Sequence, residues 1–225
     1  MSEPIVLPDH PAQRARDARD AARDRLGAAV RDLLDVVVRN GATADEIDTA
    51  ADDIATLGTT LAARPYKYRP HDNPFHPLSL VGGSAHPVAP QLRFERTADG
   101  VGGTVRLGPV FEGGPGLAHG GSLALLFDHA MGTAVFVAGH AAMTRTLEVV
   151  YAAPTPHGVD LRVSARVERV DGRKIYAAAE ITHGDTVTAT ASGLFIALTR
   201  DSVARIFRPG TIAALVDQHT DEPVG

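Results

Sequence analysis

Apolar residues in the first third of the chain recur at helical spacing. Within residues 11–39 they fall every three or four positions among arginines and aspartates, as Ala15, Ala18, Ala22, Leu26, Val30, Leu33 and Val37. This period predicts a helix that ends at Asn40-Gly41. Thr43 and Glu46 then have the spacing of a capping box, which marks the start of a second helix. The apolar stripe of this second helix comprises Ile47, Ile54, Leu57 and Leu61. We expect an N-terminal helical hairpin over residues 1–64.

Residues 65–90 break the periodic pattern. They are rich in Pro, His and Gly, and the residues that precede prolines are biased toward extended backbone. We interpret this segment as a linker or a covering loop.

From Gln91 onward apolar and polar positions alternate. In the clearest segment, Val159, Leu161, Val163, Ala165 and Val167 alternate with polar residues, which is typical of a strand buried on one face. This strand is predicted at 158–170, and further strands are predicted at 92–96, 101–107, 143–153, 173–183 and 186–198. Short turns such as Asp171-Gly172 join them, so neighbouring strands are expected to be antiparallel.

One long apolar segment interrupts these strands. A glycine-rich turn from Gly113 to Gly121 opens into it, and from Leu123 to Ala138 its only ionisable residues are Asp128 and His129. Its length and composition predict a buried helix. The order of elements therefore predicts an α+β fold over residues 91–200, with an antiparallel sheet wrapped on a long helix and a tail at 201–225 to which we assign no function.

Composition narrows the classes of function. The chain has 225 residues, 44% of them hydrophobic, which suits one globular domain with an appendage. A net charge of -5 argues against a general nucleic-acid-binding surface, and the absence of cysteine excludes disulfides and thiolate catalysis. We see no targeting segment and no apolar stretch of about 20 residues that would span a membrane. We expect a cytoplasmic protein with a small-molecule partner.

Asp128 is the first candidate for chemistry. A carboxylate within so apolar a helix is expected to be paired or to have a task, because losing its hydration costs several kcal/mol, on the order of other buried charges. The alternative is a structural carboxylate that hydrogen-bonds a neighbouring strand. The backbone N–H groups of Gly120 and Gly121 are the matching candidates at the helix N-terminus, where the helix dipole favours an anion or a polarised carbonyl. The alternative there is a merely tight turn.

The spacing of these candidates constrains how they act together. Gly120 and Asp128 are eight residues apart, and a rise of ~1.5 Å per residue separates them by roughly 12 Å along one helix. A single ester or thioester carbonyl does not reach both. If the two cooperate, a second subunit supplies one of them, which predicts a symmetric dimer with composite sites.

Other constellations carry less weight. His119 and His129 lack the spacing of a helical zinc site, and no serine lies in a nucleophile elbow, so neither a metal site nor a catalytic triad is expected. Arg169, Arg173 and Lys174 flank one hairpin turn and form the best basic cluster. They are either a solvated hairpin tip or a contact for a phosphate-bearing ligand.

A family resemblance joins these features. It is carried by Phe-Glu-Gly-Gly-Pro-Gly-Leu-Ala-His119-Gly-Gly, by Asp128 nine residues after that histidine and by Thr144 sixteen residues later. It is also carried by Asp171-Gly-Arg-Lys174 and by Ala191-Ser-Gly-Leu-Phe-Ile-Ala-Leu198. Over about residues 90–199 the chain resembles PaaI-like hotdog-fold acyl-CoA thioesterases and their acyl-coenzyme A thioesterase relatives.

The resemblance implies hydrolysis of acyl-CoA at a dimer interface, without a cofactor, in a homodimer or homotetramer. Asp128 would be the general base or nucleophile, and Gly120 N–H would hold the thioester oxygen. His119 would lie nearby and Thr144 would orient the water or the carboxylate, while Arg169 and Arg173 would contact CoA. The segment from Val150 to Pro154 departs from the basic residues that relatives can carry there.

Two alternatives stay open at this stage. One is a hotdog hydratase or dehydratase in which His119 does the acid–base work. The other is a non-catalytic acyl-CoA-binding protein.

Overall fold

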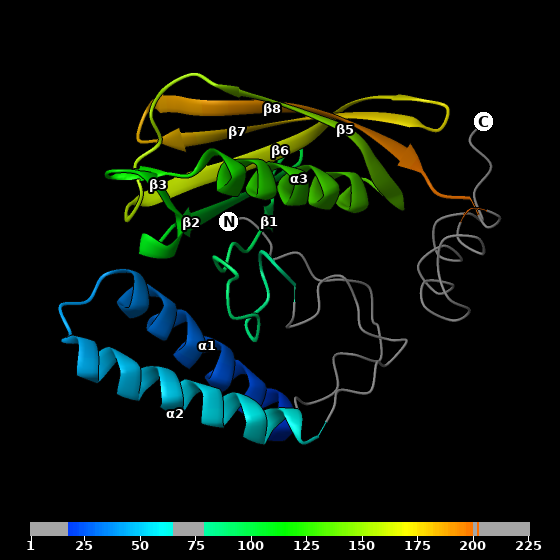
Figure 1. Cartoon of the computed structure of the whole chain (residues 1–225). Helices are drawn as coiled ribbons and strands as arrows, with labels where there is room; N and C mark the ends of the chain where they lie inside the picture. Colours follow the sequence, from blue (N-terminus) through cyan, green and yellow to red (C-terminus); the bar gives the residue numbers. More distant parts are fainter. Residues whose placement is uncertain (1–17, 65–78, 200–201, 203–225) are drawn as a thin grey trace.

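The computed structural model describes residues 18–64, 79–199 and 202 (Figure 1). Within them, a curved antiparallel sheet covers one long helix, and two further helices lie on the other side of that helix. The expected α+β arrangement is confirmed. Most of the predicted covering loop and almost all of the C-terminal tail lie outside the described residues.

The main sheet has six strands in the order β1-β2-β6-β7-β8-β5. Their bounds are β1 (Glu95–Arg96), β2 (Val101–Arg106), β5 (Ala142–Tyr151), β6 (Asp160–Asp171), β7 (Lys174–His183) and β8 (Thr186–Ala197). All neighbouring strands are antiparallel, as the short turns predicted. Gly172 and Gly184 have φ of 55° and 57° at the two tight turns, a left-handed conformation that glycine adopts without steric cost. β5 forms one edge of the sheet.

The glycine-rich segment is more ordered than a simple turn. A short 3₁₀ helix, η2 (Pro109–Phe111), leads into β3 (Glu112–Gly114), which pairs with β4 (Leu117–Ala118) in a small hairpin. Gly116 has a φ of 77° at its tip. The chain then enters α3 (Gly120–Val137) directly.

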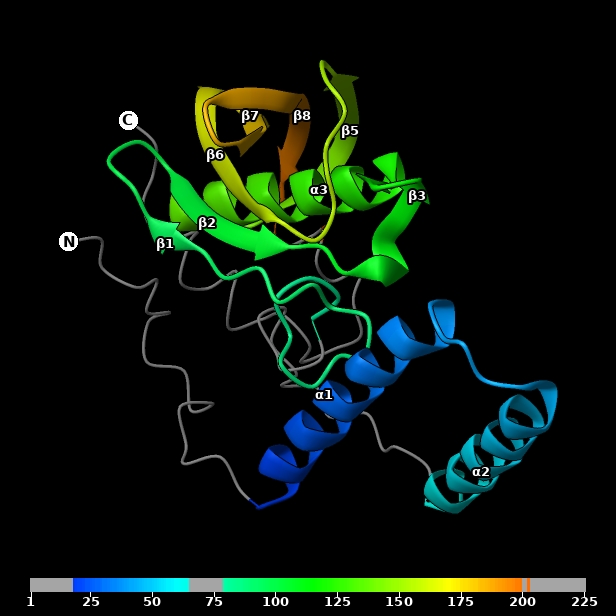
Figure 2. The same cartoon turned by 90° about the vertical axis from the view of Figure 1, so that its left-hand side faces the viewer.

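α3 packs against the concave face of the sheet, which Figure 2 shows nearly end-on. Its buried side chains include Leu126, Phe127 and Met131, which are 0% exposed, and they share one core with residues of β2, β6, β7 and β8. A Cβ on Gly193 of β8 would lie 3.1 Å from the Met131 side chain, so this glycine permits the close approach of helix and sheet. By length and composition α3 is the one described helix that qualifies as a membrane span, and its burial makes it the core helix of the sheet.

The N-terminal helices are α1 (Ala18–Val38) and α2 (Ala44–Ala62). The predicted capping box is confirmed, because the Thr43 side chain accepts from Glu46 N while the Glu46 side chain accepts from Thr43 N. The two helices run in opposite directions but diverge (Figure 2). The apolar stripe of α2 is therefore not covered by the described residues; Ile47 and Leu57 are 49% and 50% exposed.

Truncating the core helix tests this packing. We expect Phe127→Ala to lower the free energy of unfolding by about 3–5 kcal/mol, because it removes a fully buried ring and leaves a cavity. The control is Val170→Ala on the 47% exposed end of β6, for which we expect a change of about 0.5 kcal/mol or less. Urea unfolding measures both, and equal losses would contradict the assigned core.

Candidate functional site

Asp128 and Thr144 meet on the side of α3 that faces the edge strand. Asp128 lies at the middle of the helix and is partly exposed. The Thr144 hydroxyl, on β5, donates a hydrogen bond to Asp128 Oδ1 at 2.8 Å. The fold thus brings together two predicted site residues that are 16 positions apart in the sequence. A carboxylate held in this way keeps its other oxygen available to a water or a substrate.

The first N–H groups of α3 differ in whether they find an acceptor. His119 is the N-cap, and its Nδ1 accepts a hydrogen bond from Gly121 N at 3.0 Å. The N–H groups of Ser122 and Leu123 donate to the His119 carbonyl. Among the described residues, the Gly120 N–H has no hydrogen-bond acceptor. Of the two glycines singled out in the sequence, Gly120 is therefore the one whose N–H is available to a ligand.

Tyr151, which was not among the predicted site residues, also contacts this N-terminus. Its hydroxyl donates to the Gly120 carbonyl at 2.9 Å from the end of β5. A Cβ on residue 120 would lie 3.1 Å from the Tyr151 ring, so glycine lets the ring rest on the backbone. An aromatic residue with a polar tip at the end of an edge strand was the available signal.

The two halves of the candidate site lie apart within one chain. α3 is continuous from Gly120 to Val137, so the helical rise of ~1.5 Å per residue keeps Gly120 and Asp128 roughly 12 Å apart, as expected from the sequence. Tyr151 of β5 lies against the first residue of α3, and Thr144 of the same strand lies against Asp128. β5 therefore runs beside both halves.

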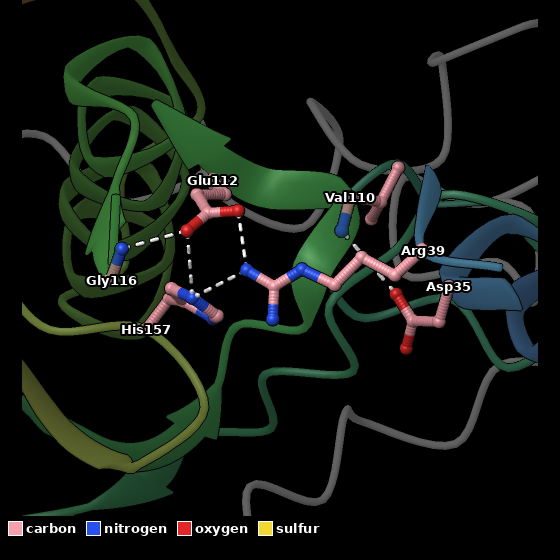
Figure 3. A network of polar contacts seen from close by, with 6 residues as sticks. All are labelled: Asp35, Arg39, Val110, Glu112, Gly116 and His157. Carbon is pink, nitrogen blue, oxygen red and sulfur yellow. Dashed lines mark hydrogen bonds and ion pairs between the residues drawn. The ribbon is translucent and has the colours of Figure 1, made fainter. Parts of the chain in front are cut away.

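A network of charged residues supports the β3–β4 turn (Figure 3). Glu112 accepts a hydrogen bond from Gly116 N at 2.7 Å and forms an ion pair with Arg39, the residue that follows α1. His157 Nε2 lies 3.3 Å from the same carboxylate. The Gly116 N–H and the Arg39 guanidinium lower the pKa of Glu112 to about 2. Nothing in the sequence pattern links Arg39 or His157 to Glu112, the acidic residue just before the glycines of this turn.

His129, next to Asp128, is a packing residue. Its ring lies 6.0 Å from the Phe94 ring, centroid to centroid, and burial lowers its pKa, which keeps the imidazole neutral at neutral pH. The His119 ring is instead engaged in the cap. No group of three or more His, Asp or Glu side chains that could hold a metal ion occurs within the described ranges.

The basic cluster lies at the end of the sheet that carries Thr144. Thr144, Phe195 and Ile175 are in register on β5, β8 and β7, so two strand spacings, about 10 Å, separate Thr144 from Ile175. Arg173 donates to the Ala197 carbonyl. Arg169 lies 4.0 Å above the Tyr176 ring and pairs with Asp171. These side chains and Lys174 are exposed at the hairpin end.

Comparisons with known proteins cover the part of the chain that holds these residues. The family model of the Thioesterase superfamily matches residues 115–190, which include Gly120, Asp128 and Thr144. The chain carries a thioesterase superfamily domain. Its curved antiparallel sheet around a central helix is the hotdog fold.

Curated relatives match the same part of the chain. Acyl-coenzyme A thioesterase THEM4 of Xenopus laevis is 39% identical over 94 residues, which are 40% of this chain and 42% of the relative. Acyl-coenzyme A thioesterase THEM5 of Mus musculus is 36% identical over 93 residues, 40% of this chain and 38% of the relative. The chain thus spans less than half the length of these curated relatives.

A solved structure matches more of this chain than the family model does. It is a thioesterase superfamily protein, 29% identical, with a TM-score of 0.73 over 87% of this chain and 97% of its own. Residues 79–225 number 147, which is about 65% of the 225 residues and less than the 87% that the match covers. The likeness therefore extends into the N-terminal part. That relative therefore shares more with this chain than the sheet and α3.

The network around Glu112 predicts a pH dependence of stability. Folding lowers the pKa of Glu112 from 4.5 to about 2, so the stabilisation is complete above about pH 5 and is lost as the pH falls from 4.5 toward 2. We expect Glu112→Gln to destabilise the protein at pH 7 and the difference from wild type to shrink by pH 3. Urea unfolding at each pH measures this, and a difference that grows on acidification would contradict it.

Proposed function

We propose that this protein hydrolyses acyl-CoA thioesters to a free acid and CoA. The observation that supports this proposal is the Thr144–Asp128 hydrogen bond on a thioesterase superfamily domain. At the N-terminus of the same helix, the Gly120 N–H meets no acceptor in the part of the chain that the structure describes. The names of the curated relatives support acyl-CoA as the substrate class.

The residues suffice for hydrolysis of an activated ester. Gly120 N–H donates to the thioester oxygen and stabilises the charge that develops there. Asp128 takes a proton from a water whose oxygen attacks the carbonyl carbon, the C–S bond breaks, and CoA leaves as a thiolate that is then protonated. Asp128 acting as a nucleophile is the second route, through an anhydride that water cleaves. In both routes Thr144 holds the carboxylate in place.

Two copies of the chain supply both halves of each site. β5 is an edge strand with exposed apolar side chains; Met143 is 43% exposed, and Val150 and Tyr151 are 54% exposed. Antiparallel pairing of two β5 strands about an axis near Leu147 brings Thr144 beside the end of the partner's strand. Because Tyr151 at that end bonds the Gly120 carbonyl, the partner's helix N-terminus then faces Asp128. The proposed unit is a homodimer, alone or within a homotetramer.

The nucleotide part of CoA is assigned to the basic hairpin end. Lys174 pairs with Ile196, which pairs with Met143, so two strand spacings, about 10 Å, separate Lys174 from the residue before Thr144. A long ligand spans this distance, and Arg169 offers a guanidinium already oriented over Tyr176. Phosphate groups suit such exposed cations.

Acid–base work by His119 on a hydroxyacyl or enoyl thioester fits the geometry less well. Its Nδ1 is occupied by the Gly121 N–H, whereas Asp128 is held by Thr144 and partly exposed. Hydrolysis uses the Asp128 carboxylate. A protein that only binds acyl-CoA would have no use for a carboxylate held by Thr144.

Removing the carboxylate charge tests the reaction. We expect Asp128→Asn to lower kcat for acyl-CoA hydrolysis by about 10² or more, and Thr144→Val by about tenfold, because the base is lost in the first and misoriented in the second. Asp160→Asn, which changes an exposed carboxylate at the other side of the sheet, is the matched control. Thiol release from a panel of acyl-CoAs measures turnover. Unchanged hydrolysis by Asp128→Asn would refute its role.

Removing the donor tests the composite site. Proline is tolerated at the first helical position and lacks an N–H, so Gly120→Pro should lower kcat by about 10²–10³. Gly120→Ala, which adds the same Cβ beside Tyr151 but keeps the N–H, should lose far less.

Mixed dimers extend this test. In a heterodimer of Asp128→Asn and Gly120→Pro subunits, one of the two composite sites keeps both groups, so about half the wild-type turnover should return. Dual-tag purification isolates this species. Turnover no higher than the mean of the parent variants would place both groups in one chain and overturn the interface.

A further inference from the structure

Helix α1 docks on the rest of the molecule through polar side chains. Its contacting residues fall on one face, at the helical spacing of three or four positions: Asp24, Gly27, Arg31 and Asp35, followed by Arg39 just past the end. Leu26, Leu33 and Val37 of the predicted apolar stripe, in contrast, are 38–53% exposed. The predicted apolar stripe is thus not the face that docks.

The first contacts of this face fix α1 against the segment before β1. Ser84 Oγ donates to Asp24 Oδ1 at 2.8 Å, and Arg31 donates to the carbonyls of Ser84 and His86 at 3.0 and 2.7 Å. A Cβ on Gly27 would lie 2.5 Å from the Ala85 carbonyl oxygen, so backbone meets backbone there. α1 is therefore held independently of its last turn.

The last turn of α1 and the residue after it contact the segment from Gly108 to Glu112, which leads into the glycine-rich turn. Asp35 Oδ1 accepts a hydrogen bond from Val110 N at 3.3 Å, and a Cβ on Gly108 would lie 2.7 Å from its other oxygen. Arg39 then pairs with Glu112, which begins β3 (Figure 3). Residues more than 70 positions apart in the sequence are joined at this point.

Glu112 transmits this contact to the β3–β4 turn. One carboxylate oxygen accepts from Gly116 N at the tip of the turn, and the other faces Arg39. His157, from the loop before β6, lies beside both, with Nε2 3.2 Å from Arg39 Nη2 and 3.3 Å from Glu112 Oε1. Figure 3 shows the carboxylate between the turn and the guanidinium. The left-handed Gly116 is thus tied to the end of α1.

The β3–β4 turn fixes the start of α3. Glu112 pairs with Ala118 in the small hairpin, and His119 N donates to the Phe111 carbonyl at 2.8 Å. A Cβ on Gly113 would lie 2.8 Å from His119 Cα, so this strand packs directly on the N-cap residue. The position of Gly120 N–H therefore follows from the position of β3.

We propose that Arg39 and Glu112 are positioning residues for the thioester-oxygen donor, which makes the N-terminal helix part of the catalytic scaffold. The inference rests on the proposed function. Arg39 holds Glu112, Glu112 holds the turn through Gly116, and the turn sets the direction of the Gly120 N–H. We call the ion pair of Arg39 and Glu112 the α1 clamp.

The α1 clamp acts on the rate of the chemical step more than on substrate binding. A donor stabilises the transition state only when it lies within hydrogen-bond distance of the developing oxyanion, and small displacements of catalytic groups are costly. The basic hairpin end assigned to CoA lies on other strands. Loosening the turn should therefore lower kcat and leave KM nearly unchanged.

The variant Arg39→Met tests the α1 clamp, and Arg25→Met is its control. Arg25 is an exposed residue of α1, the helix that Arg39 follows, so the control removes the same charge from the N-terminal part of the chain. We expect Arg39→Met to lower kcat for acyl-CoA about tenfold with KM within about twofold of wild type, and Arg39→Lys to recover most of the loss. Arg39→Met combined with Glu112→Gln should be no slower than Glu112→Gln alone, because the pair acts as a unit. A kcat equal to that of Arg25→Met, or fully additive losses, would overturn the proposal.

Amide exchange tests the same clamp without reference to activity. Mass spectrometry of the peptide that spans residues 112–121 should show faster exchange in Arg39→Met, by about tenfold at the turn, and wild-type exchange in Arg25→Met. Unchanged exchange in Arg39→Met would overturn the clamp whatever the activity. A wild-type protein that releases no thiol from acyl-CoA would instead overturn the proposed function, and the exchange result would still decide whether α1 holds the turn.

Discussion

The packing of α3 against the concave face of the sheet is the constraint on which the rest of the molecule depends. Leu126, Phe127 and Met131 are fully buried there, so the helix has no freedom to rotate about its axis. The same packing leaves Asp128 partly exposed beside β5 and presents Gly120 at the helix N-terminus. Hydrophobic burial, which supplies the stability, therefore also orients the polar groups assigned to chemistry.

The continuous helix keeps Gly120 and Asp128 at a fixed separation. Two positions eight residues apart on one continuous helix stay roughly 12 Å apart, because the rise per residue is fixed. A catalytic unit that uses both must come from two helices side by side. The exposed apolar edge at β5 is where this chain offers such an arrangement, and β5 contacts both halves of the site through Thr144 and Tyr151. The fold, the proposed dimer and the proposed function thus all depend on this one helix.

Helix α1 and the residue that follows it also contact the segment that leads into α3. α1 docks by ion pairs and hydrogen bonds to backbone carbonyls, which have directional geometry that apolar contacts lack. These polar contacts fix the position of the segment from Val110 to Gly116, which precedes α3. The likeness of a thioesterase superfamily structure over 87% of this chain indicates that the N-terminal part belongs to the architecture of at least one relative.

The sequence by itself determined the elements and most of the candidate residues. Alternation predicted the strands, the capping box predicted the start of α2, and an isolated carboxylate in an apolar helix singled out Asp128, since these signals are local. Tertiary structure alone decided that the hydroxyl of Thr144 holds Asp128, that Tyr151 rests on Gly120, that His119 occupies the Gly121 N–H, and that Arg39 reaches Glu112. Helical period revealed an apolar stripe on α1, yet the helix docks by its polar face. Periodicity reports which residues share a face, but the partner that a face meets depends on contacts between residues far apart in the chain.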